Sequence, residues 1–184
     1  MDYQKIIDRY YPDGTECRKI YMRHAVQVAD LAVGLARRCH IDLDEETIRA
    51  AAMLHDIGIF MTDAPGIDCH GTEPYIAHGT LGAALLRENG VSEEIARVAE
   101  RHTGAGITAD DIESMNLPLP KRDLMPERLL EKLICYADKF YSKSGDMQRK
   151  PFDRVCRSML RRSPATLERF MELHRLFAAD SESH

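Results

Sequence analysis

The apolar residues of this chain recur every three or four positions along most of its length, which is the spacing of one face of an α-helix. No alternating run of four or more Val, Ile, Thr or aromatic residues stands between turn residues, so the pattern of a β-strand is almost absent. The chain also has no internal repeat and no low-complexity segment. These features predict an all-α fold, arranged as an orthogonal helical bundle.

Residues that favour the beginning or end of a helix divide the chain into segments. Asp44, followed by two glutamates, is expected to begin a helix, and Gly58 is expected to help close it. Pro126 suits the first turn of another helix. Residues 62–73 and 104–126 are rich in Gly and Pro and are predicted to be irregular, apart from one short helix after Thr108. The other expected helices cover residues 3–10, 15–38, 44–55, 74–89, 92–102, 126–142, 152–162 and 164–178.

The length of 184 residues is that of one domain with a single core, and we expect residues 1–184 to form one domain. Its motif-bearing part would be residues 15–144, with the helices within 151–179 packed on it. The last five residues, 180–184, are expected to be disordered.

Composition limits where such a chain acts and what it binds. No run approaches the roughly 20 apolar residues that span a bilayer, and the N-terminus lacks the pattern of a signal peptide, so no membrane role is expected. Five cysteines without a C-x-x-C pair indicate reduced thiols in a cytoplasmic protein. A net charge of −5 disfavours binding to a nucleic-acid backbone, although a single nucleotide would need only a local positive charge or a metal.

Four histidines and one aspartate fall on the apolar faces of the expected helices. Since these faces pack inward, the five side chains are expected to be buried, and a buried carboxylate is costly unless it has a partner. Convergence on one metal would satisfy all five, although each alone could be an ordinary core residue with a hydrogen-bond partner. His174, on a similar face, is given no such role. The five residues are His24, His55, His78, His102 and Asp138.

The order of these residues resembles the HD superfamily of metal-dependent phosphohydrolases. His24 comes first, the HDIG form of the family motif follows Leu54 at residues 55–58, and Asp138 lies in the stretch 136–139. The resemblance spans about residues 18–143. It implies an HD-type helical bundle and a metal-dependent phosphohydrolase whose first metal is held by four side chains, namely His24, His55, Asp56 and Asp138.

His78 and His102 match the positions at which bimetallic members of the superfamily hold a second metal, with Asp56 as the bridge. The alternative is that the two histidines hydrogen-bond the substrate phosphate. The resemblance therefore implies one or two divalent transition-metal ions, and nitrogen and oxygen ligands do not distinguish iron, manganese, cobalt, nickel and zinc. Asp56 and His55 are the expected catalytic residues.

The chain departs from the cyclic-di-GMP phosphodiesterase branch of the superfamily. Ile59 replaces the usual lysine after HDIG, and residues 104–107 replace the Gly-Tyr-Pro motif of that branch. The stretches around His102 and Asp138 are closer to the HD hydrolases that split diadenosine tetraphosphate. The long insertion between these two residues argues against that substrate.

The expected reaction is hydrolysis of a phosphomonoester or phosphoanhydride in a nucleotide or nucleotide-like metabolite by a metal-activated water. One alternative is a di-iron oxygenase acting on a small polyol or phosphonate, and another is a non-catalytic metal- or nucleotide-binding module. Cations beside the ligands, namely Arg23, Arg101 and Lys139, are the candidates for binding the substrate. Apolar residues in the terminal helices would either seal the core or form a homodimer interface.

Overall fold

The computed structural model describes residues 2–178, so the predicted disorder of residues 180–184 concerns a segment outside the described residues. The all-α prediction is confirmed, because helices account for most of these residues. The α-helices are α1 (Tyr3–Tyr10), α2 (Glu16–Arg38), α3 (Glu45–Leu54), α4 (His78–Glu88), α5 (Glu93–Arg101), α6 (Ala109–Ser114), α7 (Leu129–Asp138), α8 (Phe152–Arg162) and α9 (Pro164–Phe177). Single 3₁₀ turns cover Ile59–Met61, Pro65–Ile67 and Tyr75–Ala77.

Side-chain caps explain where several helices begin. Thr15 accepts a hydrogen bond from the backbone N–H of Arg18, and Asp44 accepts one from Thr47. Thr108 and Ser163 cap α6 and α9 in the same way. Each cap satisfies one of the N–H groups that have no partner within the helix. Ser92 precedes α5 as predicted, but its side chain makes no such bond.

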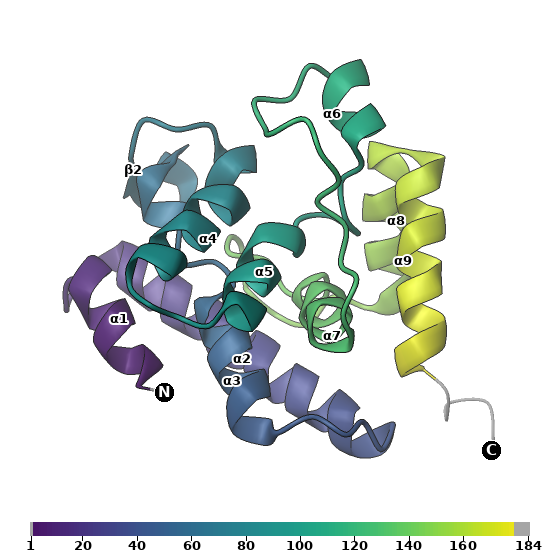
Figure 1. Ribbon diagram of the computed structural model, residues 1–184, viewed down its shortest axis with the longest axis horizontal. Coiled ribbons are helices and arrows are strands. Elements are labelled where there is room, and N and C mark those ends of the chain that lie inside the picture. The colour runs from purple at the N-terminus through teal and green to yellow at the C-terminus, as the bar shows by residue number, and fades with distance from the viewer. Residues whose placement is uncertain (1, 179–184) are drawn as a thin grey trace.

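Helices α2, α3, α5 and α7 pack against one another and form the centre of the molecule (Figure 1). Helix α4 lies along α5, α1 contacts α3, and the α8–α9 pair contacts α7 through α9. Aromatic contacts secure that last contact, because the ring of Tyr136 in α7 stacks on that of Phe170 in α9 and meets that of Phe177 at a tilt. The ligand-type residues of α2, α3, α5 and α7 therefore come from the helices that share one core.

The segment predicted to be an irregular loop at residues 62–73 contains a small hairpin. Strands β1 (Asp63–Ala64) and β2 (Cys69–His70) pair in antiparallel fashion. Strands of two residues carry no readable alternation, which is why the sequence pattern did not reveal them.

No helix within residues 2–178 is long and apolar enough to cross a membrane.

The expectations for both ends of α7 were wrong. Helix α7 begins at Leu129 rather than at Pro126, because the carboxylate of Glu131 accepts the backbone N–H groups of Glu127 and Arg128 and so fixes the start of the helix there. Beyond Asp138 the chain continues in tight i→i+3 turns rather than α-helix.

Gly58 does not close α3, which ends at Leu54. Its φ of −86° lies outside the left-handed region typical of glycine at a helix end. Its role is close packing. A Cβ on Gly58 would lie 2.3 Å from the carbonyl oxygen of His78 and 2.5 Å from the backbone nitrogen of Gly82, so a glycine is required where this backbone meets α4.

Candidate metal centre

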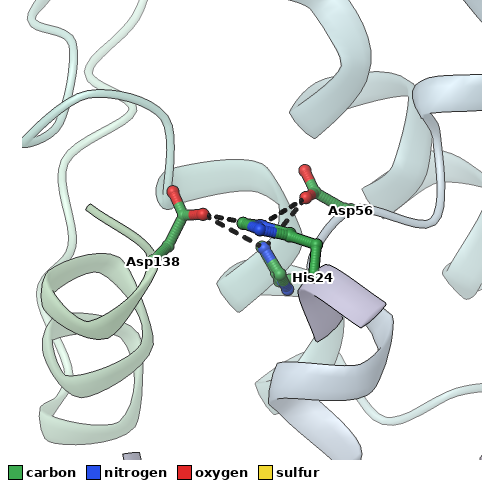
Figure 2. A group of neighbouring side chains, drawn as sticks. His24, Asp56 and Asp138 are labelled. Carbon is green, nitrogen blue, oxygen red and sulfur yellow. Dashed lines mark hydrogen bonds and ion pairs between the residues drawn. The ribbon is translucent and has the colours of Figure 1, made fainter. Parts of the chain in front are cut away.

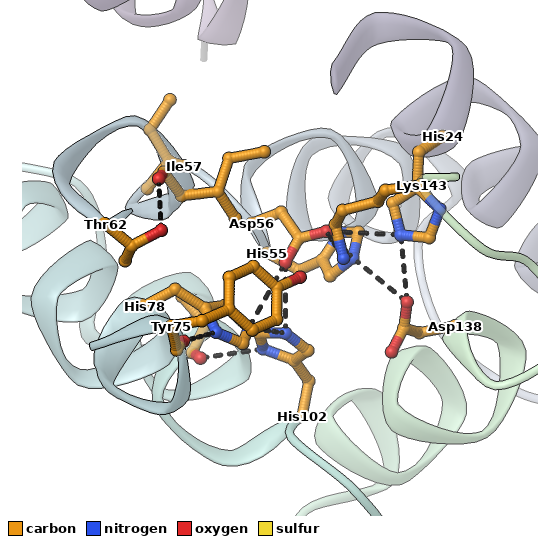
Figure 3. Close-up of polar contacts among 12 residues, drawn as sticks. His24, His55, Asp56, Ile57, Thr62, Tyr75, His78, His102, Asp138 and Lys143 are labelled. Carbon is orange, nitrogen blue, oxygen red and sulfur yellow. Dashed lines mark hydrogen bonds and ion pairs between the residues drawn. The ribbon is translucent and has the colours of Figure 1, made fainter. Parts of the chain in front are cut away.

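The structure brings together all six residues predicted as metal ligands (Figure 3). Each comes from a helix or a helix end, and each is largely or completely buried. His24 lies within α2, while the other five stand at or just beyond the ends of α3, α4, α5 and α7, where a side chain can point past the helix into the centre. These five are His55, Asp56, His78, His102 and Asp138.

Helix ends also fix how three of the imidazoles are oriented. His55 Nδ1 lies 2.6 Å from the carbonyl oxygen of Ala52, and His102 Nδ1 lies 2.8 Å from that of Ala99. His78 Nδ1 makes the equivalent contact with Tyr75 at 2.6 Å. A carbonyl can only accept, so Nδ1 carries a proton in each ring and Nε2 faces the centre, where its lone pair is free whenever the ring is neutral. Such outer contacts are typical of histidines that bind metals.

Four residues form the first ligand group (Figure 2). His24 Nε2 lies 2.9 Å from Asp138 Oδ1 and 3.2 Å from Asp56 Oδ2. His55 Nε2 lies 3.0 Å from the same oxygen of Asp56 and 3.5 Å from Asp138 Oδ1. One ligand atom from each residue lies within 4.8 Å of all the others, which is compatible with a single ion between them.

The second group uses the other oxygen of Asp56. Its Oδ1 lies 3.4 Å from His78 Nε2 and 3.3 Å from His102 Nε2, and the two nitrogens are 3.1 Å apart. Burial lowers the pKa of His78 to about 3 and also lowers that of His102, so both rings are neutral near pH 7. Two nitrogen lone pairs that face each other at this distance repel, and a cation between them would remove the repulsion.

Several buried polar atoms of the centre also lack a partner in hydrogen-bond geometry. They are both carboxylate oxygens of Asp56, Nε2 of His55 and Nδ1 of His24. Leaving such atoms unsatisfied is costly, and metal coordination would satisfy the first three. The donor set contains imidazole and carboxylate only, which fits a divalent first-row transition metal and does not identify it. Asp56, with one oxygen in each group, is placed to bridge two ions.

The charges at the centre are balanced by lysines. Lys143 Nζ lies 2.6 Å from Asp56 Oδ2, and Lys139 Nζ lies 2.6 Å from Asp138 Oδ2. Although burial opposes ionisation, the positive charges of His55 and Lys143 hold the pKa of Asp56 well below its ordinary value, and Lys139 has the same effect on Asp138. Burial lowers the pKa of His55, but the two carboxylates outweigh it and raise that pKa to about 9. Both carboxyl groups are therefore available as anionic ligands.

A cavity of about 520 Å³ opens from the centre, a volume in the range of small-molecule sites. His78, His102 and Asp138 line its inner end, and the predicted loop 62–73 contributes part of its wall. Four cationic side chains line it as well, namely Lys139, Lys143, Lys150 and Arg162.

Only one of the three predicted substrate-binding cations reaches this cavity. Lys139 lines it, and its ammonium group also donates to the carbonyl of His102. Arg23 instead donates to the carbonyl of Asp146, and Arg101 to that of Met125. Neither arginine lines the cavity, because neighbouring positions on a helix point about 100° apart.

Sequence reasoning missed Lys143, Lys150 and Tyr75. The two lysines lie in the irregular segment after α7, where no periodicity shows which way a side chain points. Tyr75 precedes α4, and its ring stacks on the imidazole of His78 at 4.7 Å between centroids, with the ammonium group of Lys143 5.9 Å from its centre. Lys143 lies five positions after Asp138, and this closeness in sequence is the signal that could have found it.

A model of the HD domain family matches residues 21–142, about two thirds of the chain, and this range contains all six ligand-type residues. The chain belongs to the HD domain family. The predicted resemblance is confirmed, and domains of this family bind divalent metals through such clusters of histidine and aspartate.

Curated relatives of this HD domain protein have mixed descriptions. An uncharacterized protein of Methanocaldococcus jannaschii is 38% identical over 125 residues, which cover 66% of each chain. Two tRNA (cytidine(56)-2'-O)-methyltransferases, from Picrophilus torridus and Thermoplasma volcanium, are 33% and 29% identical over 77% and 96% of this chain. The chain spans only 40% and 47% of those two proteins, so their name describes proteins more than twice as long as the matched region.

Two crystal structures of the HD domain of the phosphodiesterase PgpH from L. monocytogenes share the fold. One matches with a TM-score of 0.55 at 15% identity, covering 97% of this chain and 96% of that domain. The other, in complex with cyclic-di-AMP, matches with a TM-score of 0.54 at 16% identity, covering 99% and 86%. At this identity the likeness establishes the HD fold and nothing more about this chain.

Proposed function

We propose that this HD domain protein is a metal-dependent phosphohydrolase that cleaves a phosphomonoester or phosphoanhydride of a nucleotide or nucleotide-like metabolite. One observation carries the proposal. Two buried ligand groups share Asp56, and they open into a cavity whose walls bear four cationic side chains. A phosphorylated ligand needs both a polarising centre and compensating positive charge, and this cavity offers both.

The ligand residues would hold one or two divalent ions. His24, His55, Asp56 and Asp138 form the first site, and His78 and His102 complete a second one with Asp56. A bound divalent cation supplies a water of lowered pKa and polarises a phosphoryl oxygen. Asp56 and His55 fix the geometry of the centre, because both are held rigidly at the end of α3.

The lysines would bind the phosphate. Lys139 is held between Asp138 and the carbonyl of His102, so its charge stays at the inner end of the cavity. Lys150 and Arg162 line the same cavity. Placing fixed cations along the path of a phosphate chain lowers the energy of the negative charge that develops during P–O cleavage.

An oxygenase for a small polyol is weaker on the same observations, because a neutral polyol would have no use for four cations in its substrate cavity. An oxygenase for a phosphonate would use them, and tightly bound iron with oxygen consumption distinguishes it from a phosphohydrolase. An activity on tRNA, suggested by the name of two longer relatives, finds no support in the net charge of −5. The single domain over residues 1–184, the cytoplasmic location and a homodimer stay predictions.

Elemental analysis combined with a phosphate-release screen tests the proposal. The wild type, Asp56→Ala and the exposed control Asp42→Ala would be purified without added metal, then assayed over nucleotides with Mn²⁺, Co²⁺, Ni²⁺ or Fe²⁺. We expect metal near one or two equivalents and phosphate release in the wild type and the control, and loss of both in Asp56→Ala. Tightly bound iron with oxygen consumption and no phosphate release would overturn the proposal in favour of an oxygenase.

A further inference from the structure

The insertion between His102 and Asp138 builds a small unit of its own. Ile107, Ile112 and Leu124 form an apolar cluster separate from the main core. Helix α6 lies within this insertion (Figure 1). An ion pair between Asp111 and Arg169, at 2.8 Å, joins it to α9. None of the six ligand-type residues belongs to the insertion, so the metal centre does not explain why the chain has this unit.

This insertion forms most of the wall of a second cavity, of about 200 Å³. Apolar side chains line much of it, among them Ile107, Met115 and Leu117. The second cavity shares three wall residues with the cavity of the metal centre, namely Ile76, Gly104 and Arg162. The two cavities are therefore neighbours that meet at these shared wall residues.

Polar groups stand among the apolar walls. Asp111 and Arg169 both line the second cavity, and the Nε of Arg169 is buried without an acceptor. Within residues 2–178 the guanidinium group of Arg162, at the junction, makes no hydrogen bond or ion pair. Arginine can stack on a flat ring or pair with a phosphate. The second cavity thus combines apolar faces with a few polar groups, and a free cation stands at its entrance.

We propose that the second cavity seats the base of a nucleoside phosphate whose phosphate lies in the cationic cavity at the metal centre. This inference rests on the proposed function and narrows its substrate to molecules with a flat heteroaromatic head. A nucleobase has apolar faces and a polar edge, as these walls require. The second cavity holds the volume of roughly seven liquid waters, enough for one ring system, and the larger cavity accommodates the sugar and phosphate.

Calorimetric binding to the full chain, treated with a chelator so that no turnover occurs, tests the proposal. The probes are AMP, GMP, CMP and UMP beside ribose 5-phosphate. We compare wild type with Met115→Trp, which would fill the second cavity from a side chain that is 56% exposed and therefore tolerant of change. Leu117→Trp serves as a second filling variant. The matched control is Leu160→Trp, an exposed apolar residue of α8 that lines neither cavity.

We expect at least one nucleotide to bind wild type and Leu160→Trp about tenfold or more tightly than ribose 5-phosphate does. Both filling variants should lose that advantage and keep the affinity for ribose 5-phosphate. Equal affinity of all five probes for wild type, or an unchanged preference in both filling variants, would overturn the inference. Its failure is distinct from that of the proposed function. If a nucleotide is preferred but no added metal supports phosphate release, hydrolysis alone is refuted. If phosphate is released but no nucleotide is preferred over ribose 5-phosphate, the base site alone is refuted.

Discussion

Replacing Gly58 by alanine tests whether close backbone packing, rather than chain flexibility, explains the glycine of the HDIG motif. The backbone of Gly58, at φ −86° and ψ −1°, is accessible to alanine, so no conformational strain is added. The new Cβ would nevertheless lie 2.3 Å from the carbonyl oxygen of His78, 2.5 Å from the nitrogen of Gly82 and 2.9 Å from its Cα. All three are backbone atoms, so relief requires moving the start of α4.

Overpacking of this kind costs typically 1–3 kcal/mol, and a clash with three backbone atoms belongs at the upper end, about 3 kcal/mol. For a chain of this length, the midpoint of thermal unfolding would fall by about 6–12 °C. Because α4 begins with His78, metal held by the second ligand group should be lost before metal held by the first. Urea unfolding gives the free energy, and elemental analysis gives the metal content.

Gly34→Ala is the matched control. Gly34 lies on the exposed face of α2, and a Cβ there would meet no atom within 4 Å. Alanine is the better helix former, so this change should stabilise the protein by roughly 0.5–1 kcal/mol. The same substitution is thus expected to have opposite signs at the two sites. A Gly58→Ala protein within about 0.5 kcal/mol of wild type would refute the reasoning.

Three further predictions follow from single side chains. Burial lowers the pKa of Lys150 to about 8, so its positive charge is lost as the pH rises through 8, and KM for a phosphorylated substrate should rise above that pH. Lys150→Arg should flatten this pH profile of KM, because arginine stays charged. A flat profile in the wild type would contradict a role of Lys150 in binding phosphate. Arg101→Ala should lower the free energy of unfolding in urea by about 2 kcal/mol, because the carbonyl of Met125 loses its donor, and it should leave KM unchanged. A raised KM with an unchanged free energy of unfolding would instead place Arg101 in the substrate site. Tyr11→Phe removes a buried hydroxyl that donates to the carbonyl of Ile57 at 2.9 Å and should cost about 1–2 kcal/mol; unaltered urea unfolding would show that the bond contributes nothing.

The sequence by itself was sufficient for most of the helices, and together with the resemblance to the HD superfamily it was sufficient for the set of six ligand-type residues. Helix α8 has the predicted bounds, and α2 begins within one residue of its predicted start at Thr15. Helical hydrogen bonds and caps join residues at most four apart, so a short window contains the information. His24 and Asp138 are 114 residues apart, yet each stands on an apolar face, and apolar faces meet in one core.

Only the tertiary structure decided what surrounds that centre. It placed Lys143 and Lys150 in the cavity, turned Arg23 and Arg101 away from it, and assigned Gly58 to a contact with α4. The two arginines stand on α2 and α5, where the turn of the helix directs them away from the cavity, whereas the places of the two lysines and of Gly58 depend on how irregular segments from distant parts of the chain come together. Such segments have no repeating geometry, so their sequence does not indicate which way a side chain points, and their environment is fixed only when the helices that carry them have packed.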